Sequence, residues 1–270
     1  MHATSVNPLD TKRRKGSYGG KLPMIVGNDV AGKVIEIGED ITDFKVGDRV
    51  MANGTKTYAE IVSVRPDRAV KLDDSISFEE AAAIPLAGQT AYEAIVRLGE
   101  VGNNDKVLIH AGSGGVGSLA VQIAKNKGAW VAATASGSNQ EFLKSIGVDR
   151  PIDYENEAFD EVLEDIDFVL DTLGGTVLEK SLSLIEKKGK LLSIAGDPSE
   201  YVDTEKYDAD YFSVKPTEEA IDQLYEWLAN GKLEPEISEI LPFKEESVRE
   251  AHKKSETGHV RGKLIIKIKD

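Results

Sequence analysis

The residues best suited to do chemistry form a glycine cluster, Gly112, Gly114, Gly115 and Gly117, within the stretch NDKVLIHAGSGGVGSLAVQIAK at residues 104–125. The short apolar run before the cluster is typical of a strand, and the apolar residues after it have helical spacing. Strand, tight glycine turn and helix together form a dinucleotide-binding element, because glycines let a diphosphate approach the main chain and the helix N-terminus offers unpaired N–H groups. The alternative is a glycine-rich loop without a ligand.

Further candidate residues follow the next predicted strands. An NAD-preferring site carries an acidic residue after the second strand, where this chain has Thr134 and Ser136. Without the carboxylate a 2′-phosphate meets no repulsion, so we expect NADP(H), although no Arg or Lys follows at once. Gly174 and Gly196 each end a later strand, where open α/β sheets bind ligands, and would let ribose and nicotinamide lie close to the backbone. Taken singly, each is an ordinary loop glycine.

The elements that position these residues fall into two patterns. Residues 22–72 predict short strands of a small barrel, or alternatively an irregular β-rich cap, at 30–37, 44–50, 58–64 and 69–72. Helices are expected at 78–83 and 87–98, separated by Pro85. Strand–helix alternation then predicts a parallel sheet covered on both faces, with strands at 106–110, 130–134, 151–153, 167–171, 190–194 and 210–214 and helices at 115–127, 139–146, 157–164 and 175–186. Helices at 217–230 and 245–255 and a strand at 263–267 close the chain.

The composition excludes several classes of protein. The net charge is −14 and the longest basic cluster is Lys12–Lys15, so nucleic acid is not an expected partner. No apolar stretch reaches the roughly 20 residues that span a bilayer, and no signal peptide is evident, so we expect a cytoplasmic protein without a membrane partner. The chain has no cysteine and four histidines without metal-ligand spacing. Disulfides and thiolate metal sites are therefore excluded, and we expect no metal.

Taken together, the motifs resemble the zinc-independent branch of the medium-chain dehydrogenase/reductase superfamily, the quinone oxidoreductase or ζ-crystallin type. The resemblance runs from residue 3 to the end of the chain and is carried by ATSVNPLD (3–10), KLPMIVGNDVAG (21–32), FKVGDRV (44–50), TYAEIV (57–62), LAGQTAYEA (86–94), AGSGGVGSLAVQIAK (111–125), DTLGG (171–175) and GHVRGKLII (258–266). Zinc-dependent relatives carry Gly-His-Glu where this chain has Gly27, Asn28 and Asp29.

The resemblance implies an α/β fold with two domains. Residues 1–95 and 215–270 would form a GroES-like catalytic domain, and residues 96–214 a doubly wound Rossmann domain that binds NADP(H), with the active site in the cleft between them. Met1 falls within a strand of the family barrel, so we expect the strands before SVNP to be missing and the barrel to be N-terminally truncated. The family also implies a homodimer formed through the edge strand at 209–214.

The resemblance assigns roles to individual residues. It places Asn7 and Thr90 near the nicotinamide and Tyr18 in the substrate cleft, which makes Asn7 and Tyr18 the candidate catalytic residues. The other cofactor contacts it implies are Ser113, Gly114, Gly115 and Val116 at the diphosphate, Thr134 and Ser136 at the adenosine ribose, Tyr154 near the adenine, and Leu173, Gly174, Ala195, Phe212 and Val214 at the nicotinamide. Gln140 stands where a 2′-phosphate lysine is usual.

These features predict an NADPH-dependent reductase of quinones or α,β-unsaturated carbonyls. Such acceptors delocalise the incoming charge, so a hydroxyl or amide donor suffices in place of zinc. No dedicated general acid is evident, and water is the expected source of the final proton. One alternative is a non-catalytic NADPH-binding protein of the sensor or crystallin type. Another is an enoyl-thioester reductase, for which Lys12–Lys15 would be the entry for carrier phosphates.

Overall fold

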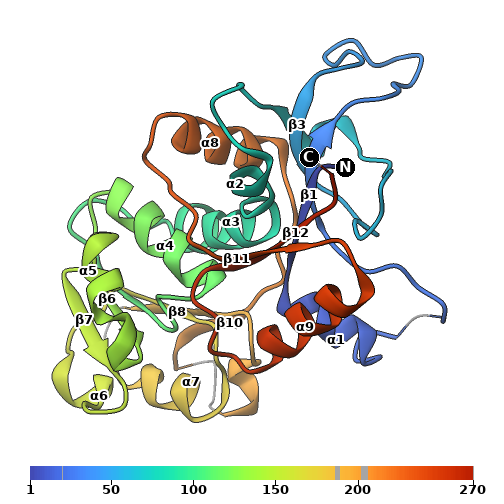
Figure 1. Cartoon of the computed structure of the whole chain (residues 1–270). Coiled ribbons are helices and arrows are strands. Elements are labelled where there is room, and N and C mark those ends of the chain that lie inside the picture. Colours follow the sequence, from blue (N-terminus) through green and yellow to red (C-terminus); the bar gives the residue numbers. More distant parts are fainter. Residues whose placement is uncertain (20, 186–188, 202–205, 270) are drawn as a thin grey trace. The chain divides into compact units, whose positions relative to one another are not determined.

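The structure, a computed structural model, describes residues 1–19, 21–185, 189–201 and 206–269. The chain divides into two compact units (Figure 1). Unit 1 comprises Met1–Gln89 and Pro216–Asp270, and unit 2 comprises Thr90–Lys215. Each unit is built around one six-stranded sheet.

The sheet of unit 1 joins the two ends of the chain. Its strands, in the spatial order β11-β12-β1-β2-β3-β4, are β1 Ala3–Val6, β2 Asp29–Lys33, β3 Arg49–Asn53, β4 Ala69–Lys71, β11 Ile237–Pro242 and β12 Lys263–Lys267. Since β12 pairs with β1, the two termini lie close together in Figure 1, and Ile268 N donates to His2 O at 2.7 Å. The helices are α1 Pro8–Arg14, α2 Phe78–Ala82, α3 Pro85–Tyr92, which continues into unit 2, α8 Glu218–Ala229, α9 Glu245–Glu256 and the 3-10 turn η1 Pro66–Arg68.

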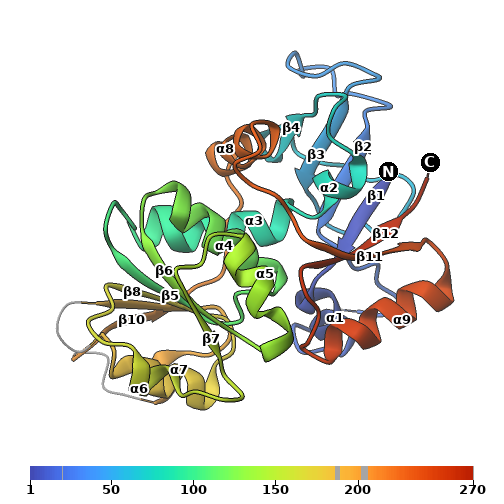
Figure 2. The same ribbon diagram turned by 60° about the vertical axis from the view of Figure 1, so that its left-hand side comes forward.

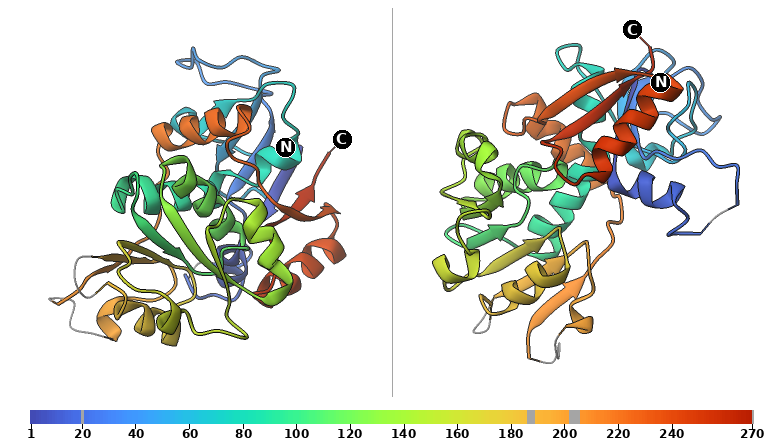
Figure 3. Two further views of the ribbon diagram at one scale, coloured as in Figure 1. Left: turned by 90° about the vertical axis from the view of Figure 1, so that its left-hand side faces the viewer. Right: turned by 60° about the horizontal axis from the view of Figure 1, so that its bottom comes forward.

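The strands β1 and β12 bury side chains on both of their faces. Val6 of β1 packs with Leu264 and Ile266 of β12 in a core that α9 covers through Ala251 (Figure 3, right). Because side chains alternate along a strand, Ser5 and Lys263 point to the other face. Both are buried there, so the sheet holds a polar cluster on the face opposite its apolar core.

The sheet of unit 2 is entirely parallel and doubly wound. Its strands, in the order β10-β9-β8-β5-β6-β7, are β5 Lys106–Ile109, β6 Trp130–Ala135, β7 Arg150–Asp153, β8 Phe168–Asp171, β9 Lys190–Ser193 and β10 Asp208–Tyr211. Figure 2 shows α4 Gly115–Asn126 and α5 Gln140–Ser145 on one face and α6 Phe159–Val162 and α7 Gly175–Leu182 on the other. The short turns are the π-helix η2 Glu93–Leu98, η3 Gly137–Asn139 and η4 Pro198–Glu200.

The strand order reverses between β5 and β8. From β5 the chain proceeds outward through β6 to β7, and it then returns to β8 on the other side of β5. In open α/β sheets, ligands bind at such a switch point, outside the carboxyl ends of the strands. The expected doubly wound fold is therefore confirmed. Its topology predicts a cofactor site at the carboxyl ends of β5 and β8.

Three expectations about elements are wrong in detail. Residues 58–64 form no strand in the described structure, because the ladder stops after Tyr58 N donates to Val26 O. The strand expected at 210–214 is Asp208–Tyr211, since its partner β9 ends at Ser193. Two separate helices are present as expected, but Pro85 is the first residue of α3 and not a residue between the helices, because the first helical position needs no N–H donor. Residue 186, the expected end of the helix from 175, lies outside the described residues.

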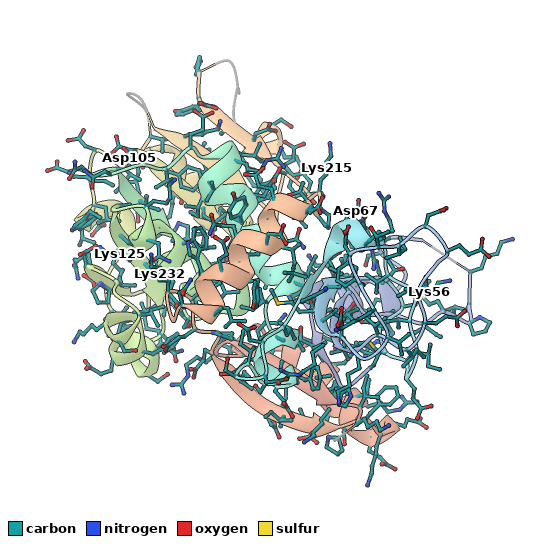
Figure 4. The ribbon with its side chains drawn as sticks, turned by 90° about the horizontal axis from the view of Figure 1, so that it is seen from above. Lys56, Asp67, Asp105, Lys125, Lys215 and Lys232 are labelled. Carbon is teal, nitrogen blue, oxygen red and sulfur yellow. The ribbon has the colours of Figure 1, made fainter. Side chains whose placement is uncertain are left out.

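Charged side chains cover the surface of both units (Figure 4). Some form pairs, as does Lys125 of α4, whose Nζ lies 2.7 Å from a carboxylate oxygen of Asp149. None of the helices in the described residues combines the length and the apolar character needed to cross a membrane.

Candidate functional site

The turn between β5 and α4 has the backbone that a diphosphate group needs. Gly114 is the N-cap of α4 in an extended conformation (φ −79°, ψ 175°), and glycine has no side chain with which to cap the first-turn N–H groups. Ser113, Gly114, Gly115 and Val116 follow one another through this turn. The helix dipole adds partial positive charge at the same place, so the turn fits an anionic group.

Two glycines of this turn are required by close packing beneath it. A Cβ atom on Gly117 would lie 2.2 Å from the carbonyl oxygen of Ala111, and one on Gly112 would lie 2.7 Å from Cβ of Ala133. Ala111 itself has a positive φ of 49°. The absence of a Cβ atom at both positions lets the turn lie close to β6 and to the start of α4.

A buried histidine, His110, supports the same turn through its contact with Thr134. His110 contacts the hydroxyls of Ser181 (Nε2 to Oγ, 2.8 Å) and Thr134 (Nδ1 to Oγ1, 3.2 Å). Burial lowers the pKa of His110 to about 4, so the ring is neutral at pH 7. Thr134 Oγ1 also accepts from Ala111 N at 3.2 Å. Thr134, an expected ribose contact, is thus buried, and its hydroxyl is committed to the loop.

The carboxyl ends of β8 and β9 are pinned together by one buried carboxylate. Asp171 accepts the N–H groups of Leu173 and Gly174, each at 3.0 Å, and the hydroxyl of Ser193 at 2.6 Å. The Ser193 oxygen in turn accepts from Ala195 N at 3.1 Å. Three expected nicotinamide contacts, Leu173, Gly174 and Ala195, therefore lie together on one rim. The DTLGG motif contained Asp171, but no local pattern indicated the role of this carboxylate.

Gly174 must be a glycine at this rim. Its φ is +72°, and an added Cβ would lie 3.3 Å from the carbonyl carbon of Ala195. The side chain of Leu173 beside it is 52% exposed. Backbone and one apolar side chain are thus presented to a ligand at the switch point.

The loop after β6 presents a group of hydroxyls. Ser136 Oγ lies 3.1 Å from Ser138 Oγ and accepts from Asn139 Nδ2 at 3.1 Å. Gln140 Nε2 donates to the carbonyl oxygens of Ala135 and Ser136 at 3.1 and 3.2 Å. The amide of Gln140 therefore shapes the loop, while the Ser136 hydroxyl lies at its exposed side. Tyr154, the expected adenine contact, is half exposed after β7.

The remaining expected residues are more scattered. Phe212 is buried beyond the end of β10 and donates its N–H to Ser193 O at 3.0 Å, which places it at the same rim, while Val214 is half-buried two residues later. Thr90 is buried in α3. Tyr18 lies in the turn after α1 and is 58% exposed, so the structure does not group it with Asn7.

In unit 1, Asn7 lies at the centre of a buried polar cluster. Its side-chain nitrogen Nδ2 donates to Asp29 Oδ2 at 2.6 Å, and its oxygen Oδ1 accepts from Lys263 Nζ at 2.6 Å. Asp29 is fully buried and also accepts from Leu86 N at 2.7 Å and from the hydroxyl of Ser5. Asp29 and Lys263 were not expected from the sequence, although both stand in motifs that carry the family resemblance.

A second chain of polar contacts begins one turn along α1. Asp10 Oδ2 accepts from Asn7 N at 2.9 Å and from the hydroxyl of Tyr58 at 3.4 Å. That hydroxyl lies 3.1 Å from His252 Nε2, whose ring is 3.2 Å from Arg14. Burial raises the pKa of Asp10 to about 6, against the effect of two backbone N–H donors. Asn7 is therefore held through both its side chain and its backbone.

The chain matches two described protein families in sequence. Residues 1–74 match the family described as "Alcohol dehydrogenase GroES-like domain", and residues 146–266 match that described as "Zinc-binding dehydrogenase". It is 34% identical over 281 residues to 2-methylene-furan-3-one reductase of Solanum lycopersicum, with 98% of this chain and 69% of the relative covered. The chain belongs to the zinc-independent quinone oxidoreductase family of medium-chain dehydrogenase/reductases.

Other related proteins also resemble the chain. The chloroplastic NADPH-dependent alkenal/one oxidoreductase of Arabidopsis thaliana is 33% identical, with 98% of this chain and 70% of the relative covered. The quinone oxidoreductase from Coxiella burnetii superposes with a TM-score of 0.92 at 37% identity and covers 99% of this chain, which spans 89% of that structure. The Escherichia coli quinone oxidoreductase, solved with NADPH, gives a TM-score of 0.87 at 26% identity, with 99% and 90% covered.

The polar cluster of unit 1 does not fit the zinc ion that the name of one matched family implies. Asn28 stands where a ligand histidine is usual, and its oxygen accepts from Arg13 at 3.1 Å. The oxygens of Asn7 and Asp29 are likewise occupied by hydrogen-bond donors. Among the described residues no group of three or more His, Cys, Asp or Glu side chains is arranged to hold a metal ion.

Proposed function

We propose that this chain is an NADPH-dependent reductase that delivers a hydride to quinones or to α,β-unsaturated carbonyl compounds. The observation that carries the proposal is the glycine turn of unit 2, beside the rim that Asp171 and Ser193 pin together. Relatives named quinone oxidoreductase and NADPH-dependent alkenal/one oxidoreductase support this substrate class. Unit 1 takes the catalytic GroES-like role and unit 2 the NADP(H)-binding Rossmann role, with 95/96 and 214/215 as the predicted boundaries.

The residues of unit 2 hold the cofactor by three kinds of contact. The N–H groups of the turn 113–116 bind the diphosphate, and the hydroxyl of the half-buried Ser136 donates to the 2′-phosphate. The rim at Leu173, Gly174 and Ala195, with Phe212 and Val214, receives the nicotinamide. Thr90 and Tyr154 complete the set of proposed contacts, and Thr134 supports the turn through its buried hydroxyl. When bound, the reduced nicotinamide supplies the hydride.

The residues of unit 1 act on the acceptor. Hydride addition to an enone or quinone places negative charge on a carbonyl oxygen, and a preorganised N–H or O–H donor stabilises that charge. Asn7 is such a donor, because the buried cluster around it fixes its side chain. Tyr18 is the second proposed donor, from an exposed turn. The resulting enolate or hydroquinone anion takes its proton from water.

The enoyl-thioester alternative is not favoured by the basic residues of α1. A carrier phosphate would have to bind the Lys12–Lys15 cluster, but Arg14 pairs with Glu256, and Lys15 Nζ lies 3.4 Å from the same carboxylate. Arg13 donates to Asn28. Arg13, Arg14 and Lys15 therefore already have partners within the protein.

The function is tested by following NADPH absorbance with a panel of quinones and enones, with NADH as the control reductant. We expect NADPH oxidation with at least one acceptor class, at a higher kcat/KM than with NADH. NADPH binding without oxidation across the panel would contradict the proposal and favour a non-catalytic binding protein. The Asn7→Ala variant should lose turnover and keep NADPH affinity within about threefold.

We further propose a homodimer, formed by pairing of β10 across two chains. The strand β10 is at one edge of its sheet and is mostly exposed, and exposed edges pair readily. Sedimentation that gives the mass of a single chain at micromolar concentration would contradict this. The cytoplasmic location stays a prediction from the sequence.

A further inference from the structure

Lys263 is an unusual lysine because it is only 5% exposed. Lysines are almost never fully buried unless they are paired. Gly262 precedes it with a positive φ of 65°, and a Cβ there would lie 2.1 Å from Glu236 O. The Nζ of Lys263 contacts Asn7 Oδ1 at 2.6 Å and Asp29 Oδ2 at 3.9 Å. The chain thus directs a buried ammonium group at the side chain of Asn7.

The chemistry of these two partners determines which way the Asn7 amide faces. A lysine ammonium group can only donate a hydrogen bond, so it requires the oxygen of the amide. An ionised carboxylate can only accept, and Asp29 already accepts from Leu86 N and Ser5. It therefore requires the amide nitrogen. If the Asn7 amide were rotated, its NH2 group would face the Lys263 ammonium group and its oxygen would face the Asp29 carboxylate.

We propose that Lys263 and Asp29 are positioning residues that fix Asn7 so that its second N–H points to the carbonyl oxygen of the quinone or enone. The Nδ2 atom carries two hydrogens, and Asp29 takes one of them. The inference rests on the proposed function, since it assigns Asn7 as the donor to the acceptor. The ion pair itself does not touch the substrate and acts through Asn7.

Two variants separate this role from a merely structural one. Lys263→Met leaves Asp29 buried and unpaired, which destabilises the fold, while Asp29 still holds the Asn7 nitrogen. The double variant Lys263→Met with Asp29→Asn removes the unpaired charge. The oxygen of the amide introduced at position 29 must then face Leu86 N, so the NH2 group of that amide faces Asn7. The Asn7 amide rotates in response and offers oxygen where it offered N–H.

From Lys263→Met to the double variant, the stability of the fold should therefore rise while kcat falls further. We expect Lys263→Met to lower kcat about tenfold, and the double variant to lower it about a hundredfold, the effect of losing one preorganised donor. The melting temperature of the double variant should lie above that of Lys263→Met. The matched control Lys267→Met, on the same strand but paired with Glu79 at a half-exposed position, should leave both values near those of the wild type.

The side-chain amide resonance of Asn7 in NMR spectra reports the orientation without turnover. We expect it to shift strongly in the double variant and to stay unchanged in Lys267→Met. If kcat recovers together with the melting temperature in the double variant, or if the resonance does not shift, the inference is overturned. A shifted resonance in a protein whose wild type reduces no acceptor would instead support the positioning and contradict the proposed function alone.

Discussion

The substitution Gly117→Ala tests the proposed phosphate-binding turn by adding a single methyl group where the structure leaves no room for one. The added methyl would start 2.2 Å from Ala111 O and 2.9 Å from Gly112 Cα. Backbone atoms cannot rotate away as a side chain can, so the turn has to move by about 1 Å to reach ordinary contact distance. Hydrogen bonds of about 2.9 Å do not survive a shift of that size.

Two effects follow, and both can be measured. Overpacking destabilises the fold by about 1–3 kcal/mol, less about 1 kcal/mol from the better helix propensity of alanine. Loss of one hydrogen bond to a charged phosphate oxygen costs about 1.5–3 kcal/mol of binding free energy. We therefore expect the Kd for NADPH, measured by fluorescence titration, to rise about tenfold to a hundredfold.

The control is Gly102→Ala in the same unit. The Cβ there has Asp105 Oδ2 at 3.8 Å as its nearest neighbour, so NADPH affinity and melting temperature should stay near those of the wild type. A Gly117→Ala protein that binds NADPH as tightly as the control, whatever its stability, would refute the assignment of this turn to the diphosphate.

Three further predictions concern other parts of the structure. Ser136→Asp places a carboxylate beside the proposed 2′-phosphate and should raise the Kd for NADPH at least about tenfold while leaving the Kd for NADH unchanged. An equal rise in both Kd values, or the same effect from the control Ser145→Asp at the far end of α5, would contradict this prediction. Asp10 has a pKa of about 6 in the folded state against an ordinary 3.8, so the folded state binds this proton more tightly. The free energy of unfolding should therefore fall by up to roughly 3 kcal/mol as the pH rises from about 4 to about 6. Urea unfolding of Asp10→Asn should lack this decline, and an identical pH profile would contradict the argument. Asp171→Asn turns an acceptor oxygen into a donor at the pinned rim and should lower the free energy of unfolding by about 2 kcal/mol; an unchanged urea midpoint would show that the rim does not depend on this carboxylate.

The doubly wound sheet was predictable because its signals are local. The strands β5, β6, β8 and β9 each have their own apolar run, and the glycines between β5 and α4 stand close together in the sequence. The cluster around Asn7 was not predictable in the same way. Asn7, Asp29 and Lys263 are 22 and 256 residues apart, and only the pairing of β12 with β1 brings the last of them to the first.

Residues 58–64 illustrate the limit of strand propensity. Tyr58, Ile61, Val62 and Val64 favour a strand by composition, but a strand also requires a neighbour to complete its hydrogen bonds. In the described structure no strand ladder follows Tyr58: Glu60 O accepts from the N-terminal ammonium group of Met1 at 2.7 Å, and Ile61 is 71% exposed. The role of Tyr58 as a partner of Asp10 and His252 depends on contacts that no local pattern contains.

The most direct test of the central claim is a calorimetric titration of the folded wild-type chain with NADPH. The backbone of the turn 113–117 should give saturable binding with one site per chain, and NADH should bind more weakly. The titration is repeated in buffers of two different ionisation enthalpies. If the folded protein then releases no heat and shows no binding with either reduced coenzyme, the claim that this turn binds a nicotinamide coenzyme is contradicted.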